Sequence, residues 1–346
     1  MDATFSAETL QLFCINLLVK SGVPYGDAEV VASVIIDTSL DGIDTHGISR
    51  LPVYLTCLQK GRINCKPEIT VIKTAPSVAI IDGDNGLGQL VAVRAMEEAM
   101  KMARETGAGV VPVRHSNHFG AATYYCKMTA GADMFGMAFT NSPPGIPPWG
   151  GKKPYLGTNP ISFGFPTGEI PVIVDMSSCN VARGNIILAA REGRAIPKGW
   201  AIDDKGKPTT DANKALEGAM LPLGGAKGYA LALAVEMLSG IASGSAFGRH
   251  VGWIYNDSME PADVGHFFIA INIANLMPVP EYIDRVELMK SEIRSVPLAE
   301  NFDRIFLPGE RKQIKATQRA KEGIPIKSGV LKELNKIAIL LGAETL

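Results

Sequence analysis

The sequence predicts an α/β protein of the α+β kind, with a largely antiparallel or mixed sheet that is unlike a Rossmann fold and a separate helical domain. Apolar residues keep helical spacing over residues 1–62, whereas several later strands follow one another with no helix between them. A chain of 346 residues favours two domains. We therefore expect a helical domain of residues 1–72 plus 285–346 and a sheet domain of residues 73–284.

Helices are expected wherever apolar residues recur every three or four positions. The first helix is capped by Ser6, with Glu8 in its first turn, and it ends at the Ser21-Gly22 turn. The charged helices of the C-terminal stretch are expected to pack back on the N-terminal ones. The predicted helices after the first are 27–40, 51–58, 90–106, 185–191, 225–241, 279–295, 313–323 and 327–341.

The strands are short β-rich runs, each bounded by Gly, Pro or Asn. They are ITVIK, SVAIID, GVVPV, FGMAFT, ISFGFP and PVIVDM, the last ending at residue 176. Only one clear helix, 90–106, lies among the first of them, which is why a mostly antiparallel or mixed sheet is expected.

Charge and cysteine usage exclude several classes of partner and location. The formal net charge is −1, so no basic excess favours nucleic acid or an anionic membrane surface. The acidic N-terminus does not resemble a secretory signal, and the apolar stretch 229–237 falls short of the ~20 residues of a membrane span. Five scattered cysteines without a CxxC pair are typical of reduced thiols. We expect a cytoplasmic protein.

A glycine-rich turn follows the second predicted strand, at Gly83, Gly86 and Gly88. Its order is G-x-x-G-x-G, whereas the dinucleotide fingerprint is G-x-G-x-x-G, and no acidic residue ends the next strand. A tight strand-to-helix turn is therefore favoured over a cofactor contact.

The segment DTHGISRLP places His46 and Arg50 four residues apart, on one face if the segment is helical. Arg offers a planar fork to a carboxylate, and His exchanges protons near neutral pH. A capping His and a surface Arg explain the spacing equally well. Thr45 could orient the imidazole or cap the next turn.

Two histidines, His115 and His118, follow a predicted strand and precede Gly120. A zinc site would need further ligands, and only Cys126 lies nearby. Alternatively, the amides of Gly120 and Ala121 open a helix and favour an anion such as pyrophosphate. Either His could also be a satisfied buried residue.

Polar groups in the later loops are further candidates for ligand contacts. Asn141 and Thr158 flank a long segment rich in turn residues, of the kind that often builds a site. Asp175 ends a strand as a possible ribose-binding edge. Lys227 lies in a glycine-rich turn that lacks the P-loop pattern, so it is either a lone charge for an anion or a solvated residue.

Taken together, DTHGISRLP, RHSNHFGAA, PPWGG, YLGTNPISFGFP, VDMSS, IPKGW, TTD and LGGAKGYALA resemble the malate/L-lactate dehydrogenase family, which includes ureidoglycolate, sulfolactate, piperideine-2-carboxylate and diketogulonate enzymes. The resemblance covers nearly the whole chain. It implies hydride transfer between NAD or NADP and a 2-hydroxy acid/2-oxo acid pair, a sheet domain that binds the cofactor, and a homodimer that shares its active sites.

The resemblance assigns catalysis to His46 and binding of the substrate carboxylate to Arg50, and Thr45 is kept as a catalytic candidate from its place beside His46. Some accounts of the family give the base to the position of His118, and we favour His46. Substrate contacts are also expected at Asn141 and Thr158, and no metal is expected. The implied cofactor contacts are His118, Phe119, Gly120, Ala121, Ala122, Thr158, Asp175, Met176, Ser177, Lys227, Pro308, Gly309, Glu310 and Arg311.

Two departures and two alternatives stay open at this point. Thr45 replaces a common Ser, and Asn185 replaces a common Lys, which leaves NAD against NADP undecided. The same scaffold could serve an NADPH-dependent cyclic imine reductase. A zinc-dependent hydrolase that uses His115 and His118 is the alternative from a different class. The expected partner is a small carboxylate substrate.

Overall fold

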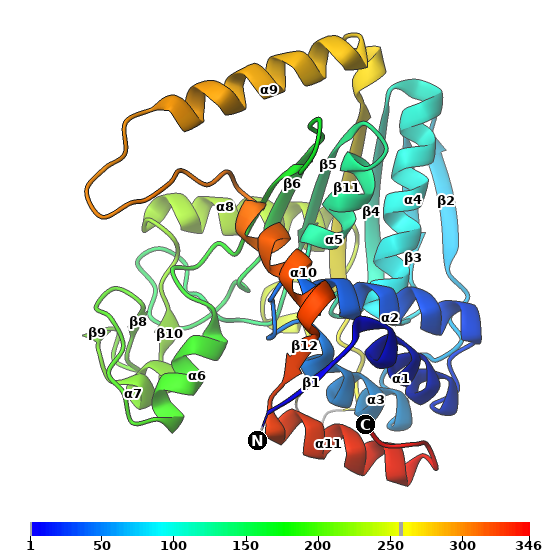
Figure 1. The fold of residues 1–346 in the computed structure, drawn as a ribbon. Helices are drawn as coiled ribbons and strands as arrows, with labels where there is room; N and C mark the ends of the chain where they lie inside the picture. Colours follow the sequence, from blue (N-terminus) through cyan, green and yellow to red (C-terminus); the bar gives the residue numbers. More distant parts are fainter. Residues whose placement is uncertain (1, 256–258) are drawn as a thin grey trace.

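A seven-stranded mixed sheet forms the centre of the protein (Figure 1). The structure is a computed structural model that describes residues 2–255 and 259–346. The strand order is β2-β3-β4-β11-β5-β6-β7, and only β3 and β4 pair in parallel. These strands are β2 (Thr70–Ala75), β3 (Val78–Asp82), β4 (Ala108–Ser116), β5 (Met134–Thr140), β6 (Ile161–Phe165), β7 (Val172–Met176) and β11 (Val264–Asn272).

The mixed α+β class is confirmed, and so are the six predicted strands. Strand β11, which pairs with β4 on one side and β5 on the other, was not predicted from the sequence. Most of its residues are buried, including Phe268 and Ala270. A strand covered on both faces has no alternation of apolar and polar residues, so its pattern could not identify it.

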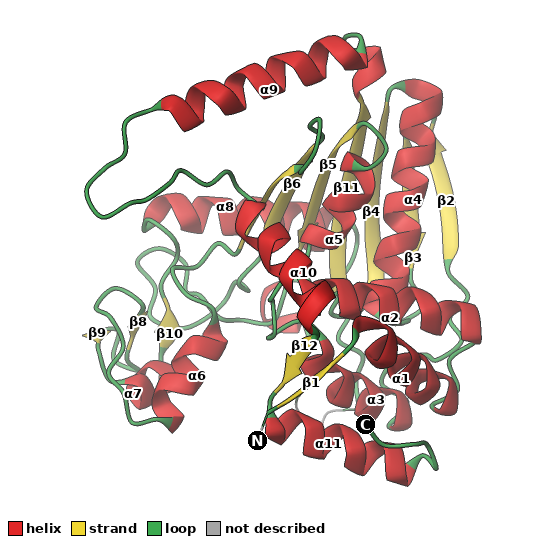
Figure 2. Ribbon diagram, in the orientation of Figure 1, coloured by secondary structure: helices red, strands yellow, loops and turns green. Residues whose placement is uncertain are grey.

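Helices cover both faces of the sheet, as Figure 2 shows. On one face, α4 (Gly88–Thr106) and α5 (Thr123–Ala130) bury Met96, Ala99 and Tyr125 against the strands. On the other face lie α8 (Ala226–Glu236) and its π-helical continuation η2 (Met237–Ala242). The predicted helix 225–241 thus forms with a change of helical type near its end.

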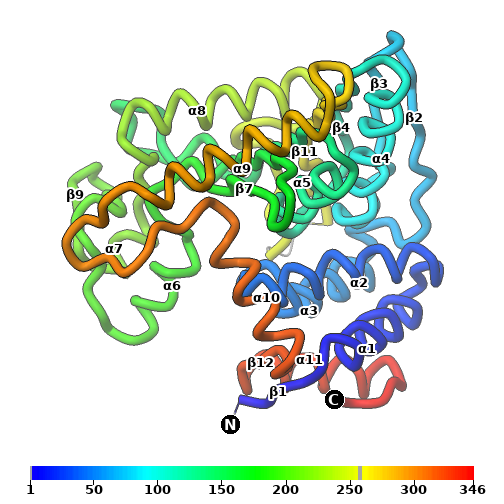
Figure 3. The backbone as a smooth tube through the Cα atoms, turned by 45° about the horizontal axis from the view of Figure 1, so that its top comes forward, coloured from blue at the N-terminus to red at the C-terminus, as the bar shows by residue number. Residues whose placement is uncertain are grey.

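The helices predicted at the N-terminus are confirmed as α1 (Ala7–Lys20), α2 (Tyr25–Leu40) and α3 (Leu51–Gln59). The Oγ of Ser6 caps α1 by accepting a hydrogen bond from the N–H of Thr9 at 3.0 Å. The C-terminal helices α10 (Glu310–Glu322) and α11 (Ser328–Leu340) pack back on these helices, as expected. Strands β1 (Ala3–Phe5) and β12 (Ile324–Ile326) pair antiparallel near both termini (Figure 3).

A smaller lobe contains α6 (Arg183–Arg191), α7 (Ala212–Glu217) and a three-stranded sheet with its own apolar core. Its strands are β8 (Ala201–Ile202), β9 (Pro208–Thr209) and β10 (Ala219–Met220). Short turns complete the fold as η1 (Ile48–Arg50), η3 (Gly248–His250) and η4 (Ile273–Asn275).

Helix α9 (Val279–Ser295) lies apart from the N-terminal helices, and a long loop leads from it to α10 (Figure 1). The ring of Tyr282 packs against that of Phe135 at 5.3 Å between centroids, which ties α9 to β5. The expected domain boundaries at residues 72 and 285 fall inside β2 and α9. The division into two domains stays a prediction.

All five cysteines carry free thiols. Within residues 2–255 and 259–346, no helix combines the length and the apolar character needed to cross a bilayer.

Candidate active site

A cavity of about 490 Å³ opens where the turn before α3, the end of β5, helix α6 and residues 252–255 meet. Cavities of this size commonly hold small ligands. Its walls combine apolar and charged side chains from segments far apart in the sequence. Those used below are His46, Arg50, His118, Phe119, Asn141, Thr158, Arg183, Ile187, Arg191, Trp253 and Tyr255.

The cavity wall includes both His46 and Arg50, although the segment that carries them is not an α-helix. It forms a turn that continues into η1, in which the N–H of Arg50 donates to Gly47 O at 2.9 Å. The turn needs glycine at position 47, because a Cβ there would lie 2.2 Å from Ser39 Oγ on α2. A tight turn therefore takes the place of the helix considered from the sequence, and it also brings His46 and Arg50 to the same cavity.

Thr45 contacts both of these side chains. A hydrogen bond of 2.9 Å joins its hydroxyl to His46 Nδ1, and its carbonyl accepts a hydrogen bond from Arg50 Nε. These contacts fix the orientation of the imidazole and of the guanidinium relative to each other.

His118 lies beside His46, with ring centroids 5.4 Å apart and planes inclined by 28°. On its other side, the Tyr54 hydroxyl is 2.6 Å from His118 Nδ1. Tyr54 is fully buried on α3, which fixes the position of its hydroxyl. The structure thus builds a row from Tyr54 through His118 to His46 at the cavity.

Both imidazoles are held neutral. Burial, together with the nearby Arg50 charge, lowers the pKa of His46 to about 4. Burial also lowers the pKa of His118 well below the ordinary value, and the Arg50 charge acts in the same direction. A neutral imidazole has a free acceptor nitrogen, so His46 is ready to accept a proton at neutral pH.

The segment that carries His118 is held by the glycine-rich turn 83–88. Asn117 Nδ2 donates to Asn85 O at 3.1 Å and to Gly86 O at 2.8 Å. A Cβ on Gly88 would lie 2.1 Å from Asn117 O, so only glycine allows this approach. The turn therefore acts through backbone packing, in line with the strand-to-helix role favoured from the sequence.

His115 and His118 do not form a common metal site. His115 Nδ1 hydrogen-bonds Asp82 at 2.9 Å, and the cavity wall does not include His115. Among the described residues, no group of three or more His, Cys, Asp or Glu side chains is arranged to hold a metal ion. The geometry does not support the zinc hydrolase alternative.

Backbone amides suited to a polar ligand follow His118. Gly120, Ala121 and Ala122 are buried, and their N–H groups donate to no acceptor in the described part of the chain. Buried amides without partners are costly, so they favour an oxygen-rich ligand at the start of α5. Phe119 adds a flat apolar wall that is backed by the ring of His266 at 4.7 Å. These features fit a nicotinamide cofactor.

Asp175, at the end of β7, lies in a cluster with α5 and α10. Its Oδ2 accepts hydrogen bonds from Thr123 Oγ1 at 2.5 Å and Lys312 Nζ at 2.7 Å. Lys312 was not predicted as a site residue, since its partner is 137 residues away in the chain. The neighbouring Met176 is 39% exposed, and Ser177 Oγ donates to Cys179 O at 3.4 Å.

The turn 308–311 lies against β7. Pro308 O accepts from the N–H of Ile173 at 3.1 Å, and Gly309 has a φ of +93°. Glu310 is buried and bound to Arg294 at 2.9 Å and Arg304 at 3.0 Å, and the Arg311 guanidinium stacks on Phe306 at 4.5 Å.

Of three further predicted site residues, Asn141 and Thr158 line the cavity and Lys227 does not. Asn141 lines the cavity, but its amide already bonds Ala246 O at 2.7 Å and the N–H of Gly265 at 3.0 Å. Thr158 lines the cavity with its hydroxyl 3.3 Å from that of Ser142. Lys227 is exposed at the start of α8 and is not part of the cavity wall.

Four other residues at or beside the cavity were not predicted as site residues, namely Tyr54, Arg183, Trp253 and Tyr255. Tyr54 was assigned only to helical spacing, and the others lie in segments without a motif. The one available signal is the four-residue spacing of Arg183, Ile187 and Arg191, which places all three on one face of α6 and on the cavity wall.

Fold and site together define a dehydrogenase that does not use the Rossmann fold, because His46, Arg50 and Gly120 line one cavity in a protein built on a mixed sheet. The chain belongs to the malate/L-lactate dehydrogenase family, whose model matches residues 5–335. This membership confirms the family and enzyme class predicted from the sequence.

Individual relatives agree over most of the chain. The L-sulfolactate dehydrogenase of Methanocaldococcus jannaschii is 44% identical over 95% of this chain and 94% of its own. The malate dehydrogenase of Pyrococcus horikoshii is 42% identical over 96% and 94%. The solved structure of the Methanocaldococcus jannaschii sulfolactate dehydrogenase superposes with a TM-score of 0.94 at 42% identity, covering 99% of this chain and 98% of that one.

The relatives also include enzymes for both nicotinamide cofactors. A (2R)-3-sulfolactate dehydrogenase (NADP+) of Chromohalobacter salexigens is 36% identical over 98% of this chain and 99% of its own. A ureidoglycolate dehydrogenase (NAD+) of Escherichia coli is 34% identical over 93% and 92%. The chain is accordingly a nicotinamide-dependent hydroxy acid dehydrogenase, as predicted.

Proposed function

We propose that this enzyme interconverts a small 2-hydroxy acid and its 2-oxo acid, with His46 as the acid/base and Arg50 as the carboxylate anchor. The observation that carries the proposal is the placement of both side chains on one turn at one cavity. A carboxylate held by the Arg50 fork puts the adjacent carbon within reach of His46.

His46 would accept the hydroxyl proton during oxidation and return it to the C2 oxygen during reduction. Negative charge develops on that oxygen in the transition state, where a positioned imidazolium stabilises it. Thr45 would orient the ring from one side. His118 is held by Tyr54 and stacked on His46, so we assign it to positioning the ring and contacting the cofactor.

The cofactor, NAD or NADP, would be held by residues 118–122, Thr158, 175–177, Lys227 and 308–311. When bound, it gives or takes the hydride at C2. The unpartnered amides of Gly120, Ala121 and Ala122 support this assignment. Phe119 excludes water from one side of the cavity, and the Thr123–Asp175–Lys312 cluster fixes β7 against α5.

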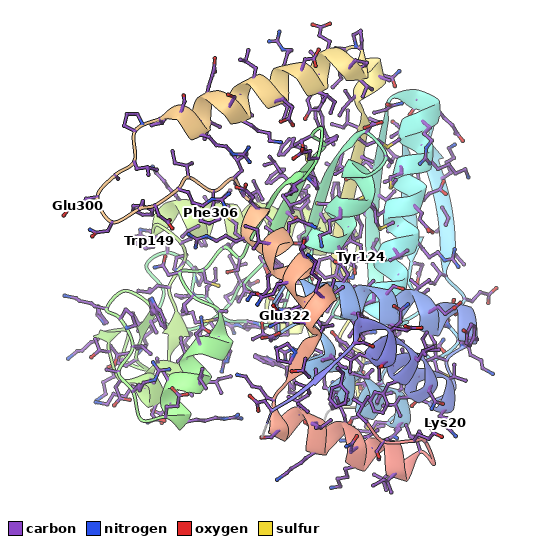
Figure 4. All side chains as sticks on the ribbon, viewed as in Figure 1. Lys20, Tyr124, Trp149, Glu300, Phe306 and Glu322 are labelled. Carbon is purple, nitrogen blue, oxygen red and sulfur yellow. The ribbon has the colours of Figure 1, made fainter. Side chains whose placement is uncertain are left out.

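We further propose a homodimer that buries the free side of α8. Leu233, Met237 and Ile241 recur every four residues and are each at least 39% exposed. Figure 4 shows Trp149 near α8, where its ring lies 3.0 Å from the position of a Cβ on Gly225. An exposed apolar row of this length is typical of a protein interface. The five free thiols support a cytoplasmic location, and we expect no nucleic-acid or membrane partner.

The test is reduced-nicotinamide absorbance with NADH and NADPH against a panel of 2-oxo acids and cyclic imines. We expect turnover of at least one 2-oxo acid, undiminished by a metal chelator. Turnover of cyclic imines alone would identify an imine reductase instead. Cyclic imines are included because the delta1-piperideine-2-carboxylate reductase structure of Pseudomonas syringae is 28% identical to this chain, with a TM-score of 0.86. Cofactor binding without turnover of any panel member would refute the proposed reaction.

A further inference from the structure

A second arginine, Arg183, contributes to the cavity that holds Arg50. It is the first residue of α6, and its side chain is partly buried. Ile187 and Arg191 follow on the same face of the helix, and both also line the cavity. The smaller lobe thus presents a cationic edge toward the turn that carries His46 and Arg50.

The two guanidinium groups are supported by neighbouring aromatic rings. Arg183 Cζ lies 5.3 Å from the ring centroid of Trp253, and Arg50 Cζ lies 5.3 Å from that of Tyr255. The two rings are 6.5 Å apart. Arginine stacked on an aromatic face keeps its orientation, so these rings hold the two cations at a fixed spacing.

The segment that carries the rings is itself anchored. Arg62, buried after α3, donates to Trp253 O at 2.6 Å and to Ile254 O at 3.3 Å. Because α3 directly follows Arg50 in the chain, the segment with both rings and the turn with Arg50 are attached to opposite ends of α3.

Neither guanidinium forms an ion pair with a carboxylate of the described residues. Two buried or partly buried carboxylates have other partners, since Asp175 binds Lys312 and Glu236 accepts hydrogen bonds from Asn159 at 2.7 Å and the Gly248 N–H at 2.7 Å. A partly buried charge without a counter-charge is costly, and an anionic ligand removes that cost.

We propose that Arg183 forms a second anion subsite opposite Arg50, so that the enzyme selects 2-oxo and 2-hydroxy acids that carry a further negative group beyond C2. Arg50 takes the C1 carboxylate, and Arg183 takes a carboxylate or sulfonate at the far end. This inference rests on the proposed function, because it uses the same cavity and the same orientation of substrate. Arg191 is exposed and lies about one helical turn beyond Ile187, where it adds positive charge at the rim of the cavity.

The experiment compares Arg183→Ala and Arg183→Lys with the wild type on three probes, which are pyruvate, oxaloacetate and 3-sulfopyruvate. For Arg183→Ala we expect kcat/KM to fall about 10- to 100-fold on the two probes with a second anion, mainly through KM. On pyruvate the change should stay within about threefold. Arg183→Lys should recover part of the loss, because it restores the charge without the fork.

The matched control is Arg194→Ala, which removes an arginine just beyond α6 that is 59% exposed and paired with Glu192. It should leave all three probes unchanged, and thermal unfolding of each variant checks that the fold is intact. A smaller loss on 3-sulfopyruvate than on oxaloacetate would identify a carboxylate as the preferred far group, and the reverse a sulfonate.

An equal loss on pyruvate, or a rise in KM for the cofactor instead of the acid, would overturn the subsite, the latter by making Arg183 a cofactor contact. Calorimetric titration of malate and lactate separates this failure from that of the proposed reaction. If no 2-oxo acid is turned over but Arg183→Ala still weakens malate binding selectively, the reaction fails and the subsite stands. If malate and lactate bind alike to wild type and variant, the subsite is wrong.

Discussion

The neutral state of His46 is the residue-scale feature with the clearest consequence for chemistry. Its ring is partly buried beside a guanidinium, and a stacked neutral His118 backs it. The proton it handles therefore has to arrive with, or leave to, the substrate hydroxyl. Spacing in the sequence was enough to single out His46 and Arg50, although a turn, not a helix, brings them together.

Replacing His46 with Ala should lower kcat in both directions about 100- to 10,000-fold, because general acid/base catalysis typically contributes that much. Binding of the reduced cofactor, followed by its fluorescence, should change little. Near-normal turnover by a folded His46→Ala variant would move the role to another residue, and a comparable loss in His118→Ala with normal Thr45→Ala would point to His118.

The pH dependence should differ between the two directions. With a pKa of about 4, His46 is largely neutral above pH 5, so kcat/KM for 2-oxo acid reduction should fall as pH rises from 5 to 8. Oxidation needs the neutral ring, so its dependence on His46 should be flat over the same range. Initial rates at saturating cofactor measure both profiles. A shared break near pH 6.5 would show an unperturbed imidazole instead.

At the scale of elements, the site depends on contacts between loops that no local pattern reveals. Periodicity and composition located most of the helices and six of the seven strands of the main sheet, but not α7 or the short strands outside that sheet. They could not place Tyr54 beside His118, 64 residues away, or Lys312 beside Asp175. Arg183 was missed for the same reason, since its aromatic partner Trp253 comes from another lobe.

Gly88→Ala tests whether the glycine-rich turn positions His118. The added Cβ would overlap the backbone of residues 117 and 118, so the segment must shift. We expect a loss of about 1–3 kcal/mol in stability and at least a tenfold loss of kcat/KM. The control is Gly329→Ala on α11, where an added Cβ meets no atom within 4 Å. Melting temperatures and initial rates measure the two effects. A Gly88→Ala enzyme equal to wild type in both would show that the turn does not position His118.

At the scale of the whole molecule, the row of Leu233, Met237 and Ile241 leaves an apolar surface of α8 and η2 exposed. One side of α8 and η2 packs on the main sheet, and the other side exposes Leu233 and Met237 to solvent. An enzyme that keeps such a row is expected to bury it against a second copy, since most soluble oligomers are symmetric dimers.

The double variant Leu233→Glu, Met237→Glu should therefore convert a dimer into a monomer. Light scattering after size-exclusion chromatography would measure the mass, and the activity of the monomer would show whether the sites are shared. Leu12→Glu on α1, at 60% exposure, is the control that should leave the mass unchanged. A monomeric wild type, or a double variant that remains dimeric, would place the interface elsewhere or exclude it.

The single parallel pair in the sheet, β3 beside β4, has a consequence for engineering. Because both strands end at the same edge, the turn 83–88 and the segment 115–118 meet there, while the β2–β3 hairpin around residues 76–77 lies at the opposite end of β3. A fluorescent reporter or affinity tag inserted in that hairpin should be carried without loss of turnover. The same insertion after β3 would separate the two loops that together position His118.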